Sequence, residues 1–383
     1  MDIYVVKEGD SVDSIALNYN IPVFKLVSDN QILWPYKLAI GQSLIIIGEN
    51  ECEYGVRNIR TNGYAYPFIS RWVLDNMLSY ISYMSVFSYG FTMDGDIIPP
   101  ELNDDFMIEI AVNKQTVPVL TLTPLGPDGK FNNELITSVV NNEEIKWKLI
   151  YELLNVMKVK GFQGVDIDFE FIKKEDRDKF TEFVNDVAVT MRNNSFFTTI
   201  ALAPKTSSDQ PGLLYEGKDY KALGEVTDGV LLMTYEWGYK YGPPMAVAPL
   251  NMVRRVIDYA VTEIDREKIN IGIPNYGYDW PLPFVAGTTE AVTIGNIEAV
   301  NIAVKYGAEI LFDEVSASPY FYYYDEYGTE HVVWFEDVRS LQEKYGLINE
   351  YGLEGLGYWN IQRWFKPMVL LLDCMFGPKS LTI

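Results

Sequence analysis

Short apolar runs alternate with longer amphipathic segments along the chain from about residue 58 onward. Eight of these runs have the length and the β-branched or aromatic content of buried strands. They are Thr61–Tyr66, Ile81–Tyr89, Val117–Thr123, Gly164–Glu170, Thr198–Pro204, Gly229–Tyr235, Ile269–Tyr276 and Gly355–Trp359. The segments between these runs have the spacing of helices that bury one face.

The helical signal is strongest between the fourth and fifth runs. Apolar residues recur there at helical intervals, at Phe180, Phe183, Val184, Val187, Ala188 and Met191. Eight strands with intervening helices in an α/β chain predict a (β/α)8 TIM barrel over 58–383, and an open doubly wound sheet is the alternative. The interval from Tyr276 to Gly355 is too long for one helix. Its alternating stretches Tyr320–Asp325 and His331–Trp334 predict a hairpin within a small α+β insertion after the seventh strand, at about 280–345.

The first 48 residues have their own pattern. A short strand over Ile3–Val6 is followed by Asp10 or Ser11 as a helix cap, then by apolar residues at helical spacing. A second short helix begins at Pro22, and the strand Ser43–Ile47 follows Gly41. The pattern predicts a separate βααβ domain over 1–48, joined to the barrel by the polar linker 49–57.

Composition narrows the functional classes. The formal charge of −22 makes nucleic acid and anionic membranes poor partners, and no apolar run is long enough to span a membrane. The N-terminus lacks the pattern of a signal peptide. Two cysteines and one histidine are too few for a Cys/His zinc site or a disulfide framework, so we expect no metal and no cofactor. Catalysis would then depend on carboxylates and tyrosines.

Three acidic residues share one face of the fourth predicted strand. Because side chains alternate along a strand, Asp166, Asp168 and Glu170 point into the barrel while Val165 and Ile167 face the helices. Carboxylates crowded in a dry space repel one another, which raises at least one pKa toward that of a general acid. A solvated acidic face or a carboxylate metal site are the alternatives. The position of Glu170 at the carboxyl end of the strand favours a catalytic role.

The N-terminal unit resembles a lysin motif (LysM) domain. The likeness is carried by Tyr4 to Ser11, Ile15-Ala16, Asn30 and Gly41 to Leu44. The resemblance implies binding to N-acetylglucosamine polymers through two loops, one with Gly9, Asp10 and Ser11 and one with Trp34. The alternative for Trp34 is that it only covers a very small core.

The fourth strand resembles the Asp-x-x-Asp-x-Asp-x-Glu signature of glycoside hydrolase family 18. Asp166, Asp168 and Glu170 match three of its four acids, and Gln163 replaces the first. Three other runs extend the likeness, namely Ser85 to Gly90, Met233-Thr234-Tyr235-Glu236 and Gly357-Tyr358-Trp359, with Glu236 where the family usually has Asp.

The resemblance implies a substrate-assisted retaining mechanism in which the 2-acetamido group of the sugar replaces an enzymic nucleophile. Glu170 would be the general acid and base, Asp168 would orient the acetamido group, and Asp166 would share a proton with Asp168. Tyr235 would hydrogen-bond the acetamido oxygen. Further substrate contacts are expected at Trp359, Glu236, Tyr89 and Tyr276.

The pairing of a LysM domain with this barrel resembles bacterial spore-cortex-lytic N-acetylglucosaminidases. That resemblance implies cortex peptidoglycan with muramic-δ-lactam as the substrate, a monomer, and a location in the spore coat or cortex or in the cell wall. Chitin or chito-oligosaccharides are the alternative substrates. A non-catalytic, lectin-like glycan-binding protein is the alternative of another class, although Glu170 and Asp168 are both present.

Overall fold

The computed structural model describes residues 1–48, 52 and 57–378. Most of the predicted linker 49–57 therefore lies outside the described residues. Eight parallel strands close into a barrel, because β3 pairs both with β4 and with β16. In order around the barrel they are β3 (Asn58–Ala65), β4 (Tyr83–Phe91), β6 (Val117–Leu122), β7 (Gly164–Ile167), β8 (Phe197–Leu202), β9 (Gly229–Leu232), β10 (Ile269–Pro274) and β16 (Gly355–Trp359). The closed barrel is confirmed, and the open sheet is excluded.

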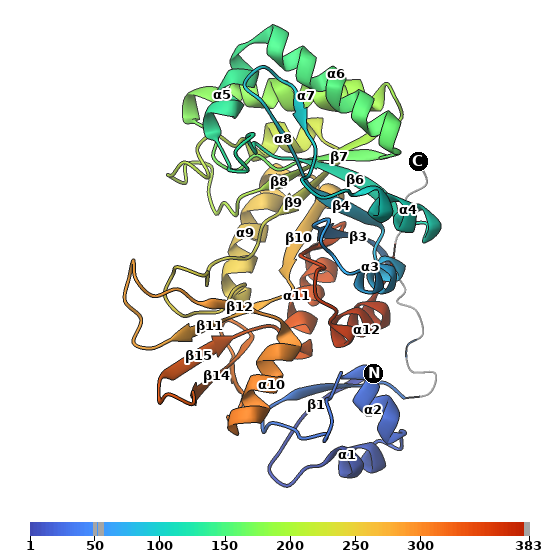
Figure 1. The fold of residues 1–383 in the computed structure, drawn as a ribbon, viewed down its shortest axis with the longest axis vertical. Helices are drawn as coiled ribbons and strands as arrows, with labels where there is room; N and C mark the ends of the chain where they lie inside the picture. The colour runs from blue at the N-terminus through green and yellow to red at the C-terminus, as the bar shows by residue number, and fades with distance from the viewer. Residues whose placement is uncertain (49–51, 53–56, 379–383) are drawn as a thin grey trace.

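Helices surround this barrel (Figure 1). They are α3 (Arg71–Met77), α4 (Asp105–Asn113), α5 (Asn133–Asn141), α6 (Glu143–Lys160), α7 (Arg177–Arg192), α8 (Tyr220–Val226), α9 (Leu250–Glu263), α11 (Val338–Tyr351) and α12 (Lys366–Met375). On α7 all six residues of the predicted apolar face are buried. Single 3-10 turns η1 (Leu78–Tyr80), η2 (Lys174–Asp176) and η3 (Arg266–Lys268) precede β4, α7 and β10, and short strands β5 (Ile97–Ile98) and β17 (Gly377–Pro378) extend the sheet.

Several strands end earlier than their apolar runs predict. The ladder of β7 ends at Ile167, so Asp168 to Glu170 lie beyond it, and β9 ends at Leu232 before Met233 to Tyr235. Single backbone bonds still anchor these segments, since Asp168 N donates to Leu122 O at 2.9 Å and Met233 N donates to Leu202 O at 2.9 Å. These residues therefore lie beyond the strand ladders, at the carboxyl end of the barrel.

The predicted insertion forms an antiparallel sheet of its own beside the barrel. It contains β11 (Gly277–Pro281), β12 (Val292–Ile294), α10 (Asn296–Tyr306), β13 (Leu311–Asp313), β14 (Ser318–Tyr324) and β15 (Glu330–Trp334). The predicted hairpin is β14–β15, with Tyr323 opposite His331. The sheet begins at Gly277, earlier than the predicted 280. The helix α11, which begins at Val338, packs against α9 and α12 of the barrel.

The N-terminal domain has the predicted βααβ order, with β1 (Asp2–Val5), α1 (Val12–Asn18), α2 (Val23–Asp29) and β2 (Ser43–Ile46). It is docked against both the insertion and the barrel, at the bottom of Figure 1. Ile310 N donates to Ile40 O at 2.8 Å, and Lys366 N donates to Gln31 Oε1 at 2.6 Å. These bonds hold the small domain at a fixed position beside α10 and α12.

Cys52 and Cys374 form a disulfide across 322 residues of sequence. Two cysteines are too few for a disulfide framework, but they do form this one crosslink. It ties the segment after the N-terminal domain to α12, the last helix of the barrel. Within the described ranges, no helix has the length and hydrophobicity needed to cross a membrane.

Candidate active site

Asp166 is held inside the barrel by two hydroxyl groups from other strands. Tyr64 of β3 donates to its Oδ2 at 2.8 Å, and Thr199 of β8 donates to its Oδ1 at 2.6 Å. Burial raises the pKa of the Asp166 carboxyl, and these two bonds oppose that rise. Asp166 is not among the residues that line the cavity described below, so it can act only through its neighbours.

Asp168 is the most perturbed of the three acids. It is 4% exposed, and its Oδ1 has no hydrogen-bond partner among the described residues. Burial raises the pKa of Asp168 well above its ordinary value, and the negative charges of Glu170 and Asp166 add to the rise. A buried acceptor without a partner is unfavourable unless a bound molecule completes it. Asp168 is therefore suited to hold a proton and to bind a polar group of a ligand.

Glu170 lies at the cavity surface next to Asp168. The residue between them, Phe169, turns to the opposite side and is fully buried. Its ring stacks at 5.6 Å from Phe91 and at 5.7 Å from Phe183. This aromatic packing fixes the backbone between the two carboxylates, so their relative position does not depend on a flexible loop.

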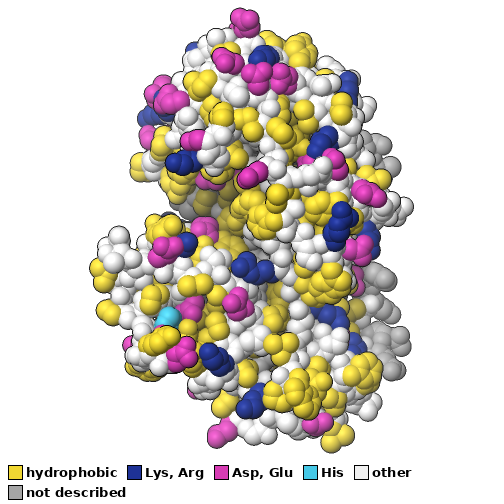
Figure 2. Space-filling model, viewed as in Figure 1, with side chains coloured by type: hydrophobic (Ala, Val, Ile, Leu, Met, Phe, Trp, Pro, Cys, Tyr) yellow, Lys and Arg dark blue, Asp and Glu magenta, His cyan; other side chains and the backbone are white. Residues whose placement is uncertain are grey.

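The cavity at the mouth of the barrel has a volume of about 630 Å³. It is lined by Tyr64, Asp168, Glu170, Phe171, Ala201, Ala203, Pro204, Leu214, Tyr215, Met233, Tyr235, Glu236, Trp237, Tyr239 and Trp359. Trp359 lies at the end of β16, with its ring centroid 4.9 Å from Phe87 and 5.4 Å from Tyr64. Figure 2 shows this side of the molecule hollowed between the insertion and the upper part of the barrel. Aromatic walls and a few acidic groups are suited to an uncharged, amphipathic ligand such as a sugar.

Tyr235 and Glu236 follow β9 and face the same cavity. Burial raises the pKa of the Tyr235 phenol well above its ordinary value, so it remains a hydrogen-bond donor at neutral pH. Glu236 accepts hydrogen bonds from Tyr278 OH, at 2.9 Å, and from Tyr276 OH. Tyr276 does not line the cavity, so the structure places it behind Glu236 and not at the position of direct contact predicted for it.

Tyr89, another predicted substrate contact, is also placed elsewhere. It is 1% exposed, and its hydroxyl donates to Asp104 Oδ2 at 2.6 Å on the helix side of the barrel. The cause is a register shift between Val86 and Tyr89 in the pairing of β4 with β6. Such an irregularity changes which face a side chain occupies, so Phe87 points inward and Tyr89 points outward. The prediction of substrate contact at Tyr89 is wrong for this structure.

Gly272 on β10 makes room for the Tyr235 ring. A Cβ at Gly272 would lie 2.5 Å from Tyr235 Cε1 and 2.8 Å from Leu232 O. If Tyr235 contacts the substrate as the sequence predicts, Gly272→Ala should displace it and lower kcat/KM roughly 10- to 100-fold, because small displacements of a group that positions the substrate are costly. Gly346→Ala is the matched control, since a Cβ at Gly346 of α11 has open space. Equal kinetics for the two variants would contradict this role of Gly272.

Gln163, which replaces the first acid of the signature, lies at the beginning of β7. Its backbone N donates to Pro118 O at 2.9 Å, at the opposite end of the strand from the cavity. Tyr64 and Thr199 donate the hydrogen bonds that Asp166 accepts. The sequence pattern predicted neither hydroxyl group, because Tyr64 lies on a distant strand and Thr199 lies opposite Asp166 only once β7 and β8 have paired.

The two loops of the N-terminal domain that are predicted to bind sugar differ in their local structure. Asp10 Oδ2 accepts hydrogen bonds from Tyr4 OH and Lys7 N, both at 2.7 Å, and Ser11 Oγ accepts from Ser14 N at 3.1 Å as the cap of α1. Gly9 precedes them in the left-handed region, at φ 84°. Trp34 in the other loop is 80% exposed, and its ring makes an edge contact with that of Tyr36 at a centroid distance of 5.2 Å. The small-core alternative for Trp34 therefore fails.

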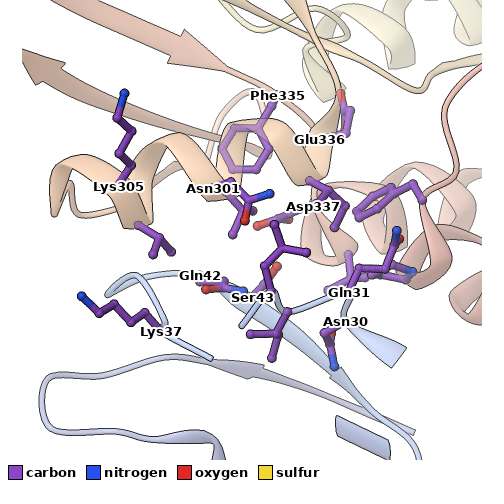
Figure 3. Close-up of a pocket in the computed structure, with 18 of the residues that line it drawn as sticks. Asn30, Gln31, Lys37, Gln42, Ser43, Asn301, Lys305, Phe335, Glu336 and Asp337 are labelled. Atoms are coloured by element: carbon purple, nitrogen blue, oxygen red, sulfur yellow. The ribbon is translucent and has the colours of Figure 1, made fainter. Parts of the chain in front are cut away.

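Trp34 borders a second cavity of about 230 Å³ between this domain and α10. Figure 3 shows Gln42 and Ser43 on the side of the N-terminal domain, opposite Asn301 and Asp337. The loop with Gly9, Asp10 and Ser11 does not contribute to this cavity. His331, the single histidine, lies in the insertion and not at either cavity; its Nδ1 is 2.8 Å from Asp279 Oδ1. No cluster of three or more His, Cys, Asp or Glu side chains in the described ranges could hold a metal ion.

Both the barrel and the N-terminal domain match known protein families. Residues 89–363 match glycosyl hydrolases family 18, and residues 4–46 match the LysM domain. The cortical fragment-lytic enzyme of Bacillus subtilis (strain 168) is 36% identical, over 98% of each chain. The crystal structure of the spore cortex-lytic enzyme SleL of Bacillus megaterium QM B1551 matches with a TM-score of 0.93 at 31% identity, over 99% of each chain. SleL of Bacillus cereus matches with a TM-score of 0.82 at 32% identity, over 99% of this chain and 87% of that one.

Proposed function

This chain belongs to family 18 of the glycosyl hydrolases and is a glycoside hydrolase with an N-terminal LysM domain, and we propose that it acts on spore-cortex peptidoglycan as an N-acetylglucosaminidase. The observation that carries the proposal is the buried Asp168, whose Oδ1 is unpartnered, beside Glu170 in an aromatic cavity. A site of this kind needs a ligand group that can donate to Asp168. The 2-acetamido N–H of N-acetylglucosamine is such a group.

The proposed reaction begins with the substrate's own acetamido group. Its carbonyl oxygen attacks the anomeric carbon, while Glu170 gives its proton to the leaving glycosidic oxygen and the carbon–oxygen bond breaks. The proton that Asp168 shares with Asp166 stays on Asp166, so the Asp168 carboxylate accepts the acetamido N–H and stabilises the positive charge that develops. Tyr235 donates to the acetamido oxygen. Water then attacks the anomeric carbon, Glu170 takes the proton of that water, and the cyclic intermediate opens.

The choice of glycan rests on the relatives. The relatives that match this chain over nearly their full length are named as cortical fragment-lytic and spore cortex-lytic enzymes. Family and relatives together exclude the non-catalytic, lectin-like alternative. Chitin fragments remain the alternative substrate, because the reaction needs only a 2-acetamido sugar. Action at the spore cortex or cell wall and a monomeric state belong to the same proposal.

Mass spectrometry of products tests the proposed substrate and bond. The protein is incubated with cortex fragments, vegetative peptidoglycan and chito-oligosaccharides under the same conditions. We expect cortex fragments to be cleaved fastest and to end in reducing N-acetylglucosamine. Reducing muramic acid would overturn the N-acetylglucosaminidase assignment, and preferential cleavage of chito-oligosaccharides would favour the alternative.

The exposed Trp34 predicts a measurable role in glycan retention. We expect Trp34→Ala to weaken binding to insoluble cortex glycan roughly three- to tenfold, the loss expected for one aromatic contact. The kcat on soluble fragments should stay unchanged, because Trp34 does not line the catalytic cavity. Phe24→Ala is the control, since Phe24 is 75% exposed elsewhere on the same domain. Equal retention of the two variants in a pull-down assay would exclude Trp34 as a sugar contact.

A further inference from the structure

Lys218 is a buried cation close to the catalytic cavity but outside its lining. It lies directly before α8 and its capping residue Asp219, in the segment that supplies Leu214 and Tyr215 to the cavity. The neighbouring Gly217 packs closely on the segment after β7, since a Cβ there would lie 2.3 Å from Ile172 O. This contact holds Lys218 in place relative to the strand that carries the acids.

The ammonium group of Lys218 has no hydrogen-bond partner in the described part of the chain. The residue is fully buried, and its Nζ is unpaired. By contrast, the nearby Lys205 Nζ donates to two backbone carbonyls, at 3.0 Å to Lys218 O and at 3.3 Å to Ser208 O. A buried, unpaired ammonium opposes folding, so its presence needs compensation from charges nearby.

The charges that face Lys218 come from two segments. Glu170 and Asp168, after β7, attract its ammonium, and Lys205, after β8, repels it. The attraction is mutual, because Lys218 also favours the ionised form of Asp168. The negative charges of Asp166 and Glu170 have the opposite effect, because they raise the pKa of Asp168. Lys218 is thus the positive charge that balances this acidic cluster.

We propose that Lys218 is a positioning residue that favours the ionised form of Asp168, because its buried and unpaired ammonium group is held against the segment that follows β7 and carries the acids. The inference rests on the proposed function, since it assumes that these two carboxyl groups carry the reaction. Lys218 does not line the cavity, so it acts through the carboxyl groups and does not touch the sugar.

The direction of the effect follows from the charges. Burial lowers the pKa of Lys218 to about 8, and Glu170 and Asp168 oppose the decrease, so Lys218 is mainly cationic at neutral pH. Its charge holds the pKa of Asp168 lower than burial and carboxylate repulsion alone would set it. Removing the cation should therefore raise the pKa at which Asp168 ionises, and the acid limb of kcat/KM should move to higher pH.

The test compares pH profiles of kcat/KM for Lys218→Met, Lys218→Arg and wild type. We expect the acid limb of Lys218→Met to shift upward by about one pH unit, the usual effect of losing a neighbouring charge, and that of Lys218→Arg to stay near wild type. Lys221→Met is the matched control, because Lys221 is exposed on α8 and its loss changes the net charge equally. If Lys218→Met does not fold, Lys218→Gln removes the same charge.

The outcomes separate this inference from the proposed function. If the wild type is active and the acid limb of the Lys218→Met and Lys218→Gln variants does not shift, the proposed role of Lys218 is wrong. A wild type without activity on cortex fragments overturns the proposed substrate, and the profiles are then measured with chito-oligosaccharides. The unfolding temperature at pH 7 is a second readout. Because Lys218 is a buried, unpaired cation, its loss should not lower the unfolding temperature. If the variants instead lose activity equally at every pH and unfold at a lower temperature, Lys218 has a structural role only.

Discussion

Replacement of Glu170 by Gln should lower kcat by about 10³-fold, the usual contribution of a general acid and base. The amide keeps the size and hydrogen bonding of the side chain but cannot give a proton to the leaving oxygen or take one from water. Glu170 lies at the cavity surface, and Phe169 anchors its backbone, so the variant should fold normally. Release of reducing ends from cortex fragments measures the loss.

Binding should survive the same substitution, since most of the cavity wall is aromatic or apolar. Tryptophan fluorescence can follow it, because Trp237 and Trp359 both line the cavity. Glu109→Gln serves as the control, as Glu109 is exposed on α4, away from the site. If Glu170→Gln retained wild-type turnover, another acid would have to be the proton donor and the proposed mechanism would fail.

Replacement of Asp168 by Asn should lower kcat by about 10²-fold or more, because a preorganised negative group beside a developing positive charge is lost. The asparagine side chain has nearly the same shape, so the cavity should not collapse. Its amide cannot share a proton with Asp166, and it offers no charge to the intermediate. Steady-state kinetics should show the loss in kcat more than in KM.

The pH profile distinguishes this role from simple packing. Burial and the charges of Glu170 and Asp166 raise the pKa of Asp168, so its ionisation should define the acid limb in the wild type. The acid limb should disappear or move in Asp168→Asn, and it should persist in Asp178→Asn, where the exposed acid of α7 is changed. An unchanged acid limb in Asp168→Asn would assign that ionisation to another group.

Much of the architecture could be predicted from the sequence, because the signals are local. Alternation along one strand is enough to place Asp166 and Asp168 on the face opposite Val165 and Ile167, and helical spacing identifies the buried face of α7. The count of apolar runs gave the closed barrel, and the short βααβ pattern gave the separate N-terminal domain. These features depend on neighbours in the sequence, so no distant contact is needed to recognise them.

The tertiary structure decided which side chains meet. A register shift in β4 turned Tyr89 outward, and β7 and β9 end before Glu170 and Tyr235, which line the cavity beyond these strands. Tyr64 reaches Asp166 from a strand 102 residues earlier, and Thr199 reaches it from the strand that pairs with β7. Lys218 is buried in the segment before α8, from where its charge acts on Asp168 and Glu170, and Cys52 pairs with Cys374 across most of the chain. Such contacts arise from closure of the barrel and from packing of its loops, and neither leaves a periodic pattern in the sequence.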